Sequence, residues 1–219
     1  MTGDSRDARV PLPSRTSDAR LVVVVRAPAA DAYDRVLDVL VDAGIRSVEL
    51  TLTTPGTLAA LPRLRERYDE AADIGVGTVT RQDELSAAID AGARYVVTPI
   101  TSAPLVEAAV AARLPIVPGG LTPTELFASW SAGAAAVKVF PAGRVGPGYV
   151  ADLRGPFPGI EVVPSGGVDL DGAAAWLRAG AAAVSVGGPL LGDAFRGGDL
   201  AALRERTARF VALCRREPA

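Results

Sequence analysis

Residues 21–52 read LVVVVRAPAADAYDRVLDVLVDAGIRSVELTL and contain one complete strand–helix–strand unit. The β-branched runs Leu21–Arg26 and Ser47–Leu52 predict strands. Four apolar residues recur at helical spacing between them: Val36, Leu37, Leu40 and Val41. Asp42-Ala43-Gly44 follows this stripe, and glycine suits the left-handed residue that ends a helix. The stretch therefore predicts a parallel βαβ unit.

The same unit recurs along the chain. Six further strands are predicted at Ile74–Val79, Tyr95–Pro99, Pro115–Pro118, Ala136–Pro141, Glu161–Ser165 and Ala183–Gly187. The total of eight, and the absence of a Gly-x-Gly-x-x-Gly turn after the first strand, favour a (β/α)₈ barrel over a dinucleotide-binding sheet. We therefore expect an α/β fold with a single-domain barrel over residues 21–219. An open sheet of five or six strands with added helices is the alternative.

Composition excludes several kinds of chemistry. The chain of 219 residues has no His, one Cys and a formal net charge of −2. It therefore has no Ser-His-Asp triad, no His-ligated metal site and no internal disulfide. The charge balance does not predict a nucleic-acid or membrane partner. We expect no metal and no cofactor, so proton transfer falls to carboxylates, Tyr, water or Lys.

The first twenty residues differ from the rest. Residues 1–20 mix Arg and Asp with Pro11 and Pro13 and show no apolar periodicity. A secretory signal would need a continuous apolar stretch there. We expect an N-terminal arm that is mobile or loosely helical, and a cytoplasmic location.

Lys138 stands out because it is the only Lys among the 23 basic residues, and it lies between Val137 and Val139 in a predicted strand. Desolvating an ammonium group is costly, and burial favours the neutral amine, which can attack a carbonyl. Arginine cannot form an imine. A single retained lysine therefore indicates a Schiff-base role, with a structural ion pair as the alternative.

Glu49 is predicted to face the same interior. Period-2 alternation places Glu49, Thr51 and Thr53 on one face of their strand. A carboxylate inside a barrel needs a partner, and Lys138 can supply the charge. We interpret Glu49 as a general acid and base; an ion pair with Lys138 or Arg26 is the structural alternative.

Two glycine pairs follow the last two strands. Ser165-Gly166-Gly167 comes after the seventh strand, and Gly187-Gly188 after the eighth. Barrels often bind phosphate with the backbone N–H groups of these loops, and glycine permits a close approach. Ordinary turn formation is the alternative.

Four further residues lie at predicted strand ends, namely Arg26, Thr78, Thr98 and Pro99. Arg26 could bind a carboxylate through two parallel hydrogen bonds. Each is individually more typical of structure than of function. Together they would surround a small anionic substrate.

These motifs occur in a known order, and the chain resembles the class I aldolases that cleave 2-keto-3-deoxy-6-phosphogluconate (KDPG) and 4-hydroxy-2-oxoglutarate (KHG). The resemblance runs from about Leu21 to Cys214, and rests on these segments: residues 44–51, Gly75–Val79, Val97–Pro99, Ile116–Glu125, Val137–Pro141 and Pro164–Val168. It implies a (β/α)₈ barrel, a homotrimer without a metal, and cleavage of a keto acid to pyruvate and an aldehyde.

The resemblance also implies roles for individual residues. The imine-forming lysine falls on Lys138 and the acid/base glutamate on Glu49. The carboxylate contact falls on Thr78, the phosphate loop on Gly166 and Gly167, and the pocket wall on Pro99 and Phe140.

Two positions depart from the family pattern. Thr53 stands where many members have an Arg that binds the pyruvate carboxylate, and Arg26 could compensate. Pro189 stands where many have a Ser, so that one phosphate contact is lost, which Ser165 could partly replace. The departures bear mainly on whether the substrate is phosphorylated. Four alternative functions remain: an aldolase for phosphogalactonate, an aldolase for an unphosphorylated sugar acid, a phosphate-binding barrel isomerase or synthase, and an inactive keto-acid-binding protein.

Overall fold

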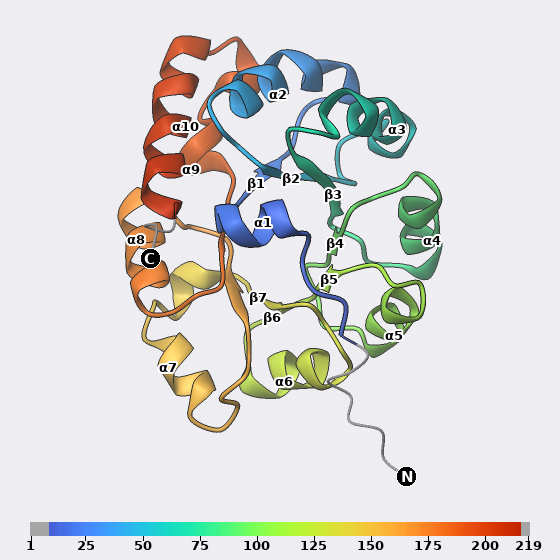
Figure 1. Ribbon diagram of the computed structural model, residues 1–219, viewed down its shortest axis with the longest axis vertical. Coiled ribbons are helices and arrows are strands. Elements are labelled where there is room, and N and C mark those ends of the chain that lie inside the picture. Colours follow the sequence, from blue (N-terminus) through green and yellow to red (C-terminus); the bar gives the residue numbers. More distant parts are fainter. Residues whose placement is uncertain (1–8, 216–219) are drawn as a thin grey trace.

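The computed structural model describes residues 9–215 and shows an α/β fold built on parallel strands (Figure 1). One sheet has the strand order β5-β4-β3-β2-β1-β9, and a second has the order β6-β7-β8. The strands are β1 (Leu21–Val25), β2 (Ser47–Thr51), β3 (Asp73–Gly77), β4 (Val96–Val97), β5 (Ile116–Val117), β6 (Gly119–Gly120), β7 (Val137–Val139), β8 (Val162–Pro164) and β9 (Val184–Val186). Each predicted strand overlaps an observed one.

The two sheets are joined by hydrogen bonds on both sides. On one side, Pro118 separates β5 from β6, and its carbonyl accepts a 2.8 Å hydrogen bond from the backbone N–H of Lys138. The predicted strand Pro115–Pro118 therefore corresponds to β5 alone, and β6 is a separate short strand beyond it, because proline has no N–H to continue a ladder. On the other side, Ala182 N donates to Val162 O at 2.9 Å, and Ser165 bridges Ser185 in parallel.

Helices surround the strands in sequence order, as Figure 1 shows. The longer ones are α2 (Tyr33–Asp42), α3 (Thr57–Tyr68), α4 (Gln82–Asp90), α5 (Ala103–Ala111), α6 (Pro123–Ser131), α8 (Leu170–Arg178) and α10 (Leu200–Cys214); α7 (Tyr149–Arg154) and α9 (Gly188–Leu191) are short. The predicted helix-ending glycines, Gly44, Gly92, Gly133 and Gly180, all have positive φ, between 80° and 104°. In α2, the apolar stripe buries Val36, Leu37 and Leu40 as predicted.

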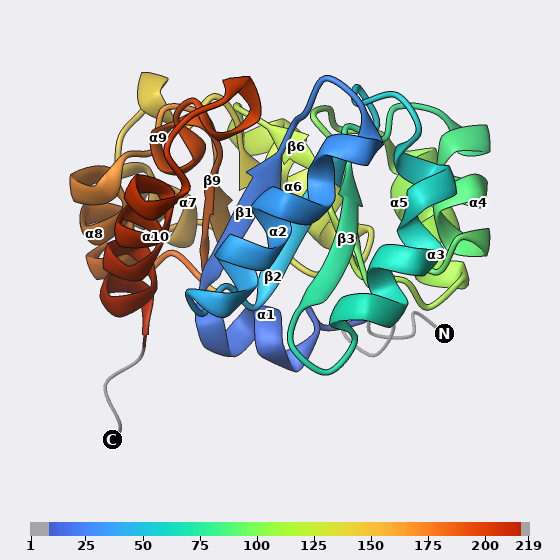
Figure 2. The ribbon, with the colours of Figure 1, turned by 90° about the horizontal axis from the view of Figure 1, so that it is seen from above.

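A short helix, α1 (Ser14–Ala19), lies across the end of the sheets at which the strands begin (Figure 2). Thr16 is fully buried there; its hydroxyl donates to Asp73 Oδ2 at 2.9 Å and lies within hydrogen-bond distance, 2.8 Å, of Ser47 Oγ. Ser47 and Asp73 are the first residues of β2 and β3. These contacts therefore attach α1 to the end of the sheets at which the strands begin, which is called the floor of the fold below. Residues 1–8 of the predicted arm lie outside the described residues.

Arg9 fastens the chain before α1 to the opposite side of this floor. Its guanidinium lies 3.3 Å above the Trp130 ring and donates to the carbonyls of Trp130 and Ala134. Stacking and charge-assisted hydrogen bonds act together at this contact. The described N-terminal segment therefore spans the floor from α6 to β2 and β3.

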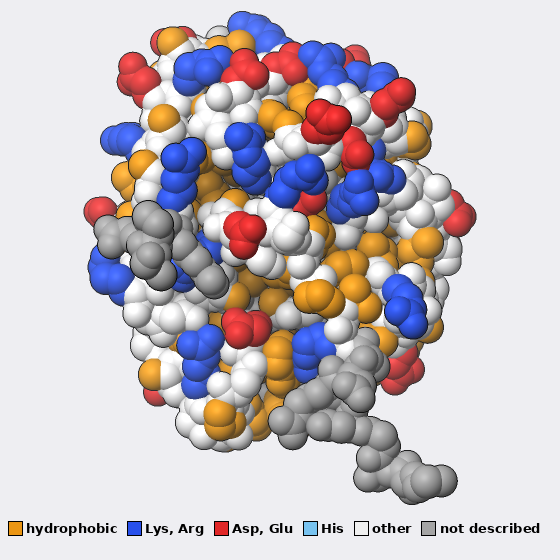
Figure 3. Space-filling view, in the orientation of Figure 1, with side chains coloured by type: hydrophobic (Ala, Val, Ile, Leu, Met, Phe, Trp, Pro, Cys, Tyr) orange, Lys and Arg blue, Asp and Glu red, His pale blue; other side chains and the backbone are white. Residues whose placement is uncertain are grey.

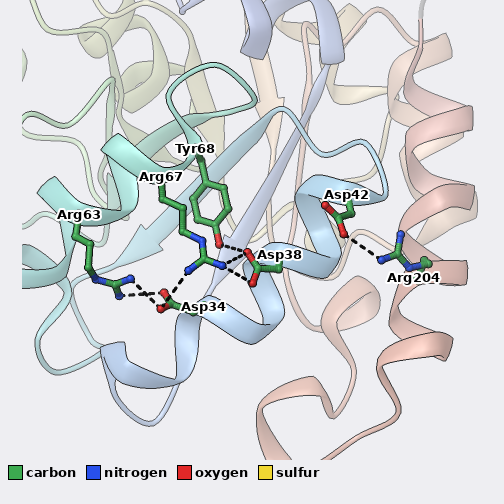
Figure 4. A network of polar contacts seen from close by, with 7 residues as sticks. All are labelled: Asp34, Asp38, Asp42, Arg63, Arg67, Tyr68 and Arg204. Carbon is green, nitrogen blue, oxygen red and sulfur yellow. Dashed lines mark hydrogen bonds and ion pairs between the residues drawn. The ribbon is translucent and has the colours of Figure 1, made fainter.

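Ion pairs connect neighbouring helices on the outside (Figure 4). The network contains Asp34, Asp38 and Asp42 of α2, Arg63, Arg67 and Tyr68 of α3, and Arg204 of α10. Exposed pairs of this kind add little stability each. Basic and acidic side chains are interspersed over these helices (Figure 3), so neither charge dominates this face. Within residues 9–215, no helix is long and apolar enough to span a membrane.

Candidate active site

A cavity of about 350 Å³ opens at the end of the sheets opposite α1. It is lined by residues of β1, β2, β7 and β9 and by the segments that follow β1, β3, β4, β7, β8 and β9. The predicted residues on its wall are Arg26, Glu49, Thr78, Pro99, Lys138, Phe140, Ser165, Gly166, Gly167, Gly187 and Gly188. The carboxyl ends of parallel strands are the usual place for ligands in such folds.

Lys138 and Glu49 meet inside this cavity. Lys138 is the middle residue of β7 and only 7% exposed, and its Nζ lies 3.9 Å from Glu49 Oε1. The Nζ also lies 5.4 Å from the centre of the Phe140 ring. The amine is therefore held among a carboxylate, an aromatic face and the open cavity, where a carbonyl compound could reach it.

The Glu49 carboxyl is almost completely buried. Its residue is 1% exposed, and its Oε2 has no hydrogen-bond partner in the described part of the chain. Burial raises the pKa of Glu49, and the positive charges of Lys138 and Arg26 offset that rise only in part. Desolvation thus outweighs the ion pair, and a carboxyl with a raised pKa can hold a proton for transfer.

Gly77 is the last residue of β3. Because it has no side chain, the Glu49 carboxyl can occupy the space beside it. A Cβ on residue 77 would overlap Glu49 Oε1, Cδ and Cγ. The neighbouring Gly75 similarly accommodates the Tyr95 ring, where a Cβ would lie 2.5 Å from ring atoms. The glycines of the Gly75-Val-Gly77 strand therefore have a steric role that positions Glu49.

We predict that Gly77→Ala lowers kcat by about 100-fold or more, because a displacement of roughly 1 Å at a reacting group has an effect of that size. Steady-state kinetics and a thermal melt test this. Gly148→Ala is the matched control, since a Cβ there meets nothing within 4 Å. An unchanged kcat in the Gly77→Ala variant would contradict this steric role of Gly77.

The two glycine loops lie side by side at the cavity. Gly166 and Gly167 have φ of 85° and 77°, a conformation that side chains disfavour. A Cβ on Gly166 would lie 3.1 Å from the Phe140 ring, so glycine lets this loop approach Phe140. The backbone N–H groups of Gly167 and Val168 donate to no acceptor in residues 9–215. Free N–H groups in a concave loop can bind an anion.

Thr78 has an unusual backbone at the cavity. Its φ is 64°, in the left-handed region that a β-branched residue rarely adopts. Such strain is typical of functional sites. Thr78 therefore lies at the cavity wall, directly after β3, in a strained backbone conformation.

Comparison with known proteins identifies the family. The sequence model for KDPG and KHG aldolase matches residues 12–205. The chain belongs to the KDPG and KHG aldolase family. Members of this family are carbon–carbon lyases, so the chain is an aldolase.

Individual aldolases of this family agree with that assignment. The 2-dehydro-3-deoxy-6-phosphogalactonate aldolase of Escherichia coli is 32% identical over 193 residues, which is 88% of this chain and 91% of the relative. The 2-dehydro-3-deoxy-phosphogluconate aldolase of Pseudomonas aeruginosa is 35% identical over 173 residues, which is 78% of this chain and 73% of the relative. A solved structure described as native KDPGal superposes with a TM-score of 0.81 at 30% identity, over 88% of this chain and 93% of that one.

Two residues expected at the aldolase site do not line this cavity. Thr53 is exposed, because β2 ends at Thr51 and a turn follows, in which Thr54 N donates to Thr51 O. The prediction that Thr53 shares the inward face of this strand is therefore wrong. Thr98 is buried beside the cavity wall but does not line it, and its hydroxyl donates to Ile100 O.

Several residues of the aldolase cavity were not expected from the sequence. These are Val24, Val168, Ser185, Leu191, Gly192, Phe195 and Arg196. Ser185 is 3% exposed, and its Oγ accepts a 3.2 Å hydrogen bond from Ser165 Oγ. A polar residue between two valines in a strand is the signal that identified Lys138, and it could have identified Ser185. In residues 9–215, no three His, Cys, Asp or Glu side chains gather as metal ligands would.

Proposed function

We propose that this chain is a Schiff-base aldolase that cleaves a 2-keto-3-deoxy-6-phospho sugar acid, or 4-hydroxy-2-oxoglutarate, to pyruvate and an aldehyde. The observation that carries the proposal is the buried pair of Lys138 and Glu49, 3.9 Å apart, in the cavity of a member of the aldolase family. Lys138 is the nucleophile, and Glu49 is the acid and base.

In this mechanism the neutral amine of Lys138 attacks the C2 ketone, and water leaves as an iminium forms. Glu49 takes the proton of the C4 hydroxyl while the C3–C4 bond breaks, so the bonding electrons enter the iminium and give an enamine. The aldehyde is released at this point. Glu49 then returns the proton to C3, and hydrolysis of the iminium frees pyruvate and Lys138.

The surroundings of Glu49 and Lys138 support the role of each residue in this cycle. The Glu49 carboxyl must accept and then donate a proton, and the raised pKa of Glu49 makes its protonated form accessible. Lys138 has its reactive nitrogen at the cavity, while its main chain is held in β7 between Val137 and Val139. The nucleophile therefore stands on a rigid element, which limits misplacement of the reacting atoms.

The remaining wall residues are assigned to the two anionic ends of the substrate. Arg26 and Thr78 bind the keto-acid carboxylate; the Arg26 guanidinium makes no hydrogen bond or ion pair within residues 9–215, and its charge acts on the nearby Glu49 carboxyl. Ser165, Gly166, Gly167, Gly187 and Gly188 bind the phosphate, and Pro99 and Phe140 form the wall. The free N–H groups of the Gly166 loop support this assignment.

A second substrate is favoured by a specific observation. The phosphogalactonate aldolase of Escherichia coli matches 88% of this chain, and the phosphogluconate aldolase of Pseudomonas aeruginosa matches 78%. The two substrates differ in configuration at C4. Initial rates with both epimers, measured under the same conditions, decide which is the substrate.

We also propose that the two sheets form one closed (β/α)₈ barrel and that the chain assembles as a homotrimer. The hydrogen bonds that join β5 to β7 and β8 to β9 support closure. The exposed Phe127, stacked on Phe157 with ring centres 4.3 Å apart, gives an aromatic surface suited to a subunit contact. Light scattering of the purified protein tests the subunit count.

Borohydride trapping tests the chemistry. We expect the protein, incubated with pyruvate and then reduced, to gain one covalent adduct, which peptide mass spectrometry maps to Lys138. The enzyme without pyruvate is the control. A reduced protein of unchanged mass would refute the Schiff base.

A further inference from the structure

Arg196 is a cavity residue to which neither the sequence pattern nor the family resemblance gives a role. It is the last residue of the 3₁₀ helix η3 (Ala194–Arg196), which follows α9. It lines the cavity together with Gly187, which follows β9, and with Gly188 and Pro189 at the start of α9. A basic side chain thus stands beside the loops that would hold the anionic tail of a substrate.

The segment that carries Arg196 is well anchored. Phe195 packs edge-to-face on the fully buried Tyr33, with ring centres 6.5 Å apart, and Ala194 is buried. Arg206 of α10 donates to the carbonyls of Leu190 and Leu191 at 2.9 and 3.2 Å. The backbone of this turn is therefore fixed from both sides, which limits the region that the Arg196 side chain can reach.

The guanidinium of Arg196 has no anionic partner in the described part of the chain. Within residues 9–215 its one hydrogen bond runs from Nη2 to the carbonyl of Gly192, at 3.5 Å. Other exposed arginines of this protein do pair with carboxylates, as Arg63 does with Asp34 at 2.8 Å. A guanidinium group at a cavity wall that has no carboxylate partner is suited to donate two parallel hydrogen bonds to a phosphate.

The start of α9, beside Arg196, has one hydrogen-bond donor fewer at Pro189. Pro189 has no backbone N–H and no hydroxyl, so the first turn of α9 offers fewer hydrogen bonds than it would with a serine at this position. The Gly166 loop supplies neutral N–H groups but no charge. A phosphate in this cavity would therefore depend on a cation from another element.

We propose that Arg196 binds the phosphate at the tail of the substrate and thereby determines the preference for phosphorylated keto acids. The inference rests on the proposed aldolase function and concerns only the substrate tail. Arg196 takes no part in bond cleavage. Its loss therefore weakens the binding of phosphorylated substrates without altering the Schiff base at Lys138.

The test compares Arg196→Ala with wild type on a phosphorylated 2-keto-3-deoxy acid and its unphosphorylated analogue. For the phosphorylated substrate we expect kcat/KM to fall about 10- to 100-fold, mainly through KM, as the loss of charge-assisted hydrogen bonds implies. For the analogue, kcat/KM stays unchanged. Arg196→Lys restores part of the loss, and inorganic phosphate inhibits Arg196→Ala more weakly than wild type.

Arg209→Ala is the matched control, because Arg209 is an exposed arginine of α10 outside the cavity and its removal changes the net charge equally. Equal losses with both substrates, or no loss with the phosphorylated one, would overturn the inference. Pyruvate trapping on Lys138 distinguishes a failure of the proposed aldolase mechanism from a failure of the proposed role of Arg196. A wild type that traps no pyruvate refutes the aldolase mechanism, whereas normal trapping with an unchanged kcat/KM in Arg196→Ala refutes only the role of Arg196.

Discussion

Lys138→Arg is expected to abolish aldol cleavage, lowering kcat by more than about 10⁴-fold, because a guanidinium keeps the positive charge but cannot form an imine. The variant should also gain no borohydride adduct with pyruvate. Steady-state kinetics and intact-protein mass spectrometry measure the two effects. The fold should remain, since Arg can still pair with Glu49 across the 3.9 Å that separates the wild-type charges.

Two measurements make this result specific. Circular dichroism and a thermal melt verify that the Lys138→Arg variant is folded. Arg209→Lys is the control, because it replaces one basic residue by the other at an exposed position. Because Lys138 is the only lysine, the Lys138→Arg variant has no other ε-amine. Cleavage that persisted in a folded Lys138→Arg variant would rule out lysine imine chemistry altogether.

Glu49→Gln is expected to lower kcat by about 10²–10⁴-fold, the usual range for loss of a general acid and base. Glutamine keeps the shape of the side chain but cannot transfer a proton. Pyruvate should still be trapped on Lys138, though more slowly, because the nucleophile is present. Unimpaired turnover by this variant would assign proton transfer to another group.

The same substitution has a predicted effect on stability. Burial raises the pKa of Glu49, so the folded protein holds this proton more tightly than the unfolded chain does. Its contribution to stability is thus greatest at low pH and declines as pH rises from the unfolded pKa through the folded one. A glutamine side chain does not titrate, so the melting temperature of Glu49→Gln relative to wild type should rise across that window. Glu107→Gln, at an exposed position of α5, should show no such trend.

The inward charged residues could be predicted because they contrast with their surroundings. Lys138 interrupts a run of valines, and Glu49 alternates with Val48 and Leu50, so both stand out within strands that are otherwise apolar. Repeats of one βαβ pattern likewise indicated the strand positions. These are local signals, and local signals are visible in a single sequence.

Residues at strand ends could not be placed in the same way. Alternation assigns a face only while the strand continues, and the hydrogen bond from Thr54 N to Thr51 O closes a turn that takes Thr53 out of the pattern. Thr98 and Pro99 are adjacent, yet only Pro99 lines the cavity. Where a strand stops depends on turn contacts that periodicity does not encode.

Arg196 was not predictable for a different reason. Its neighbours form no strand or amphipathic helix, so no period marks it. It reaches the cavity because Phe195 packs on Tyr33, a contact between segments far apart in the sequence. Long-range packing of this kind becomes visible only in the folded chain.

The burial of Lys138 has a consequence for the enzyme in contact with its own product. Aldehydes condense with exposed amines, and an aldolase generates them at every turnover. With its only lysine 7% exposed inside a cavity, this protein offers such aldehydes no ε-amino group on its exterior. Imine formation on side chains is thereby confined to the one position where it is productive, and the surface positive charge is carried by guanidinium groups.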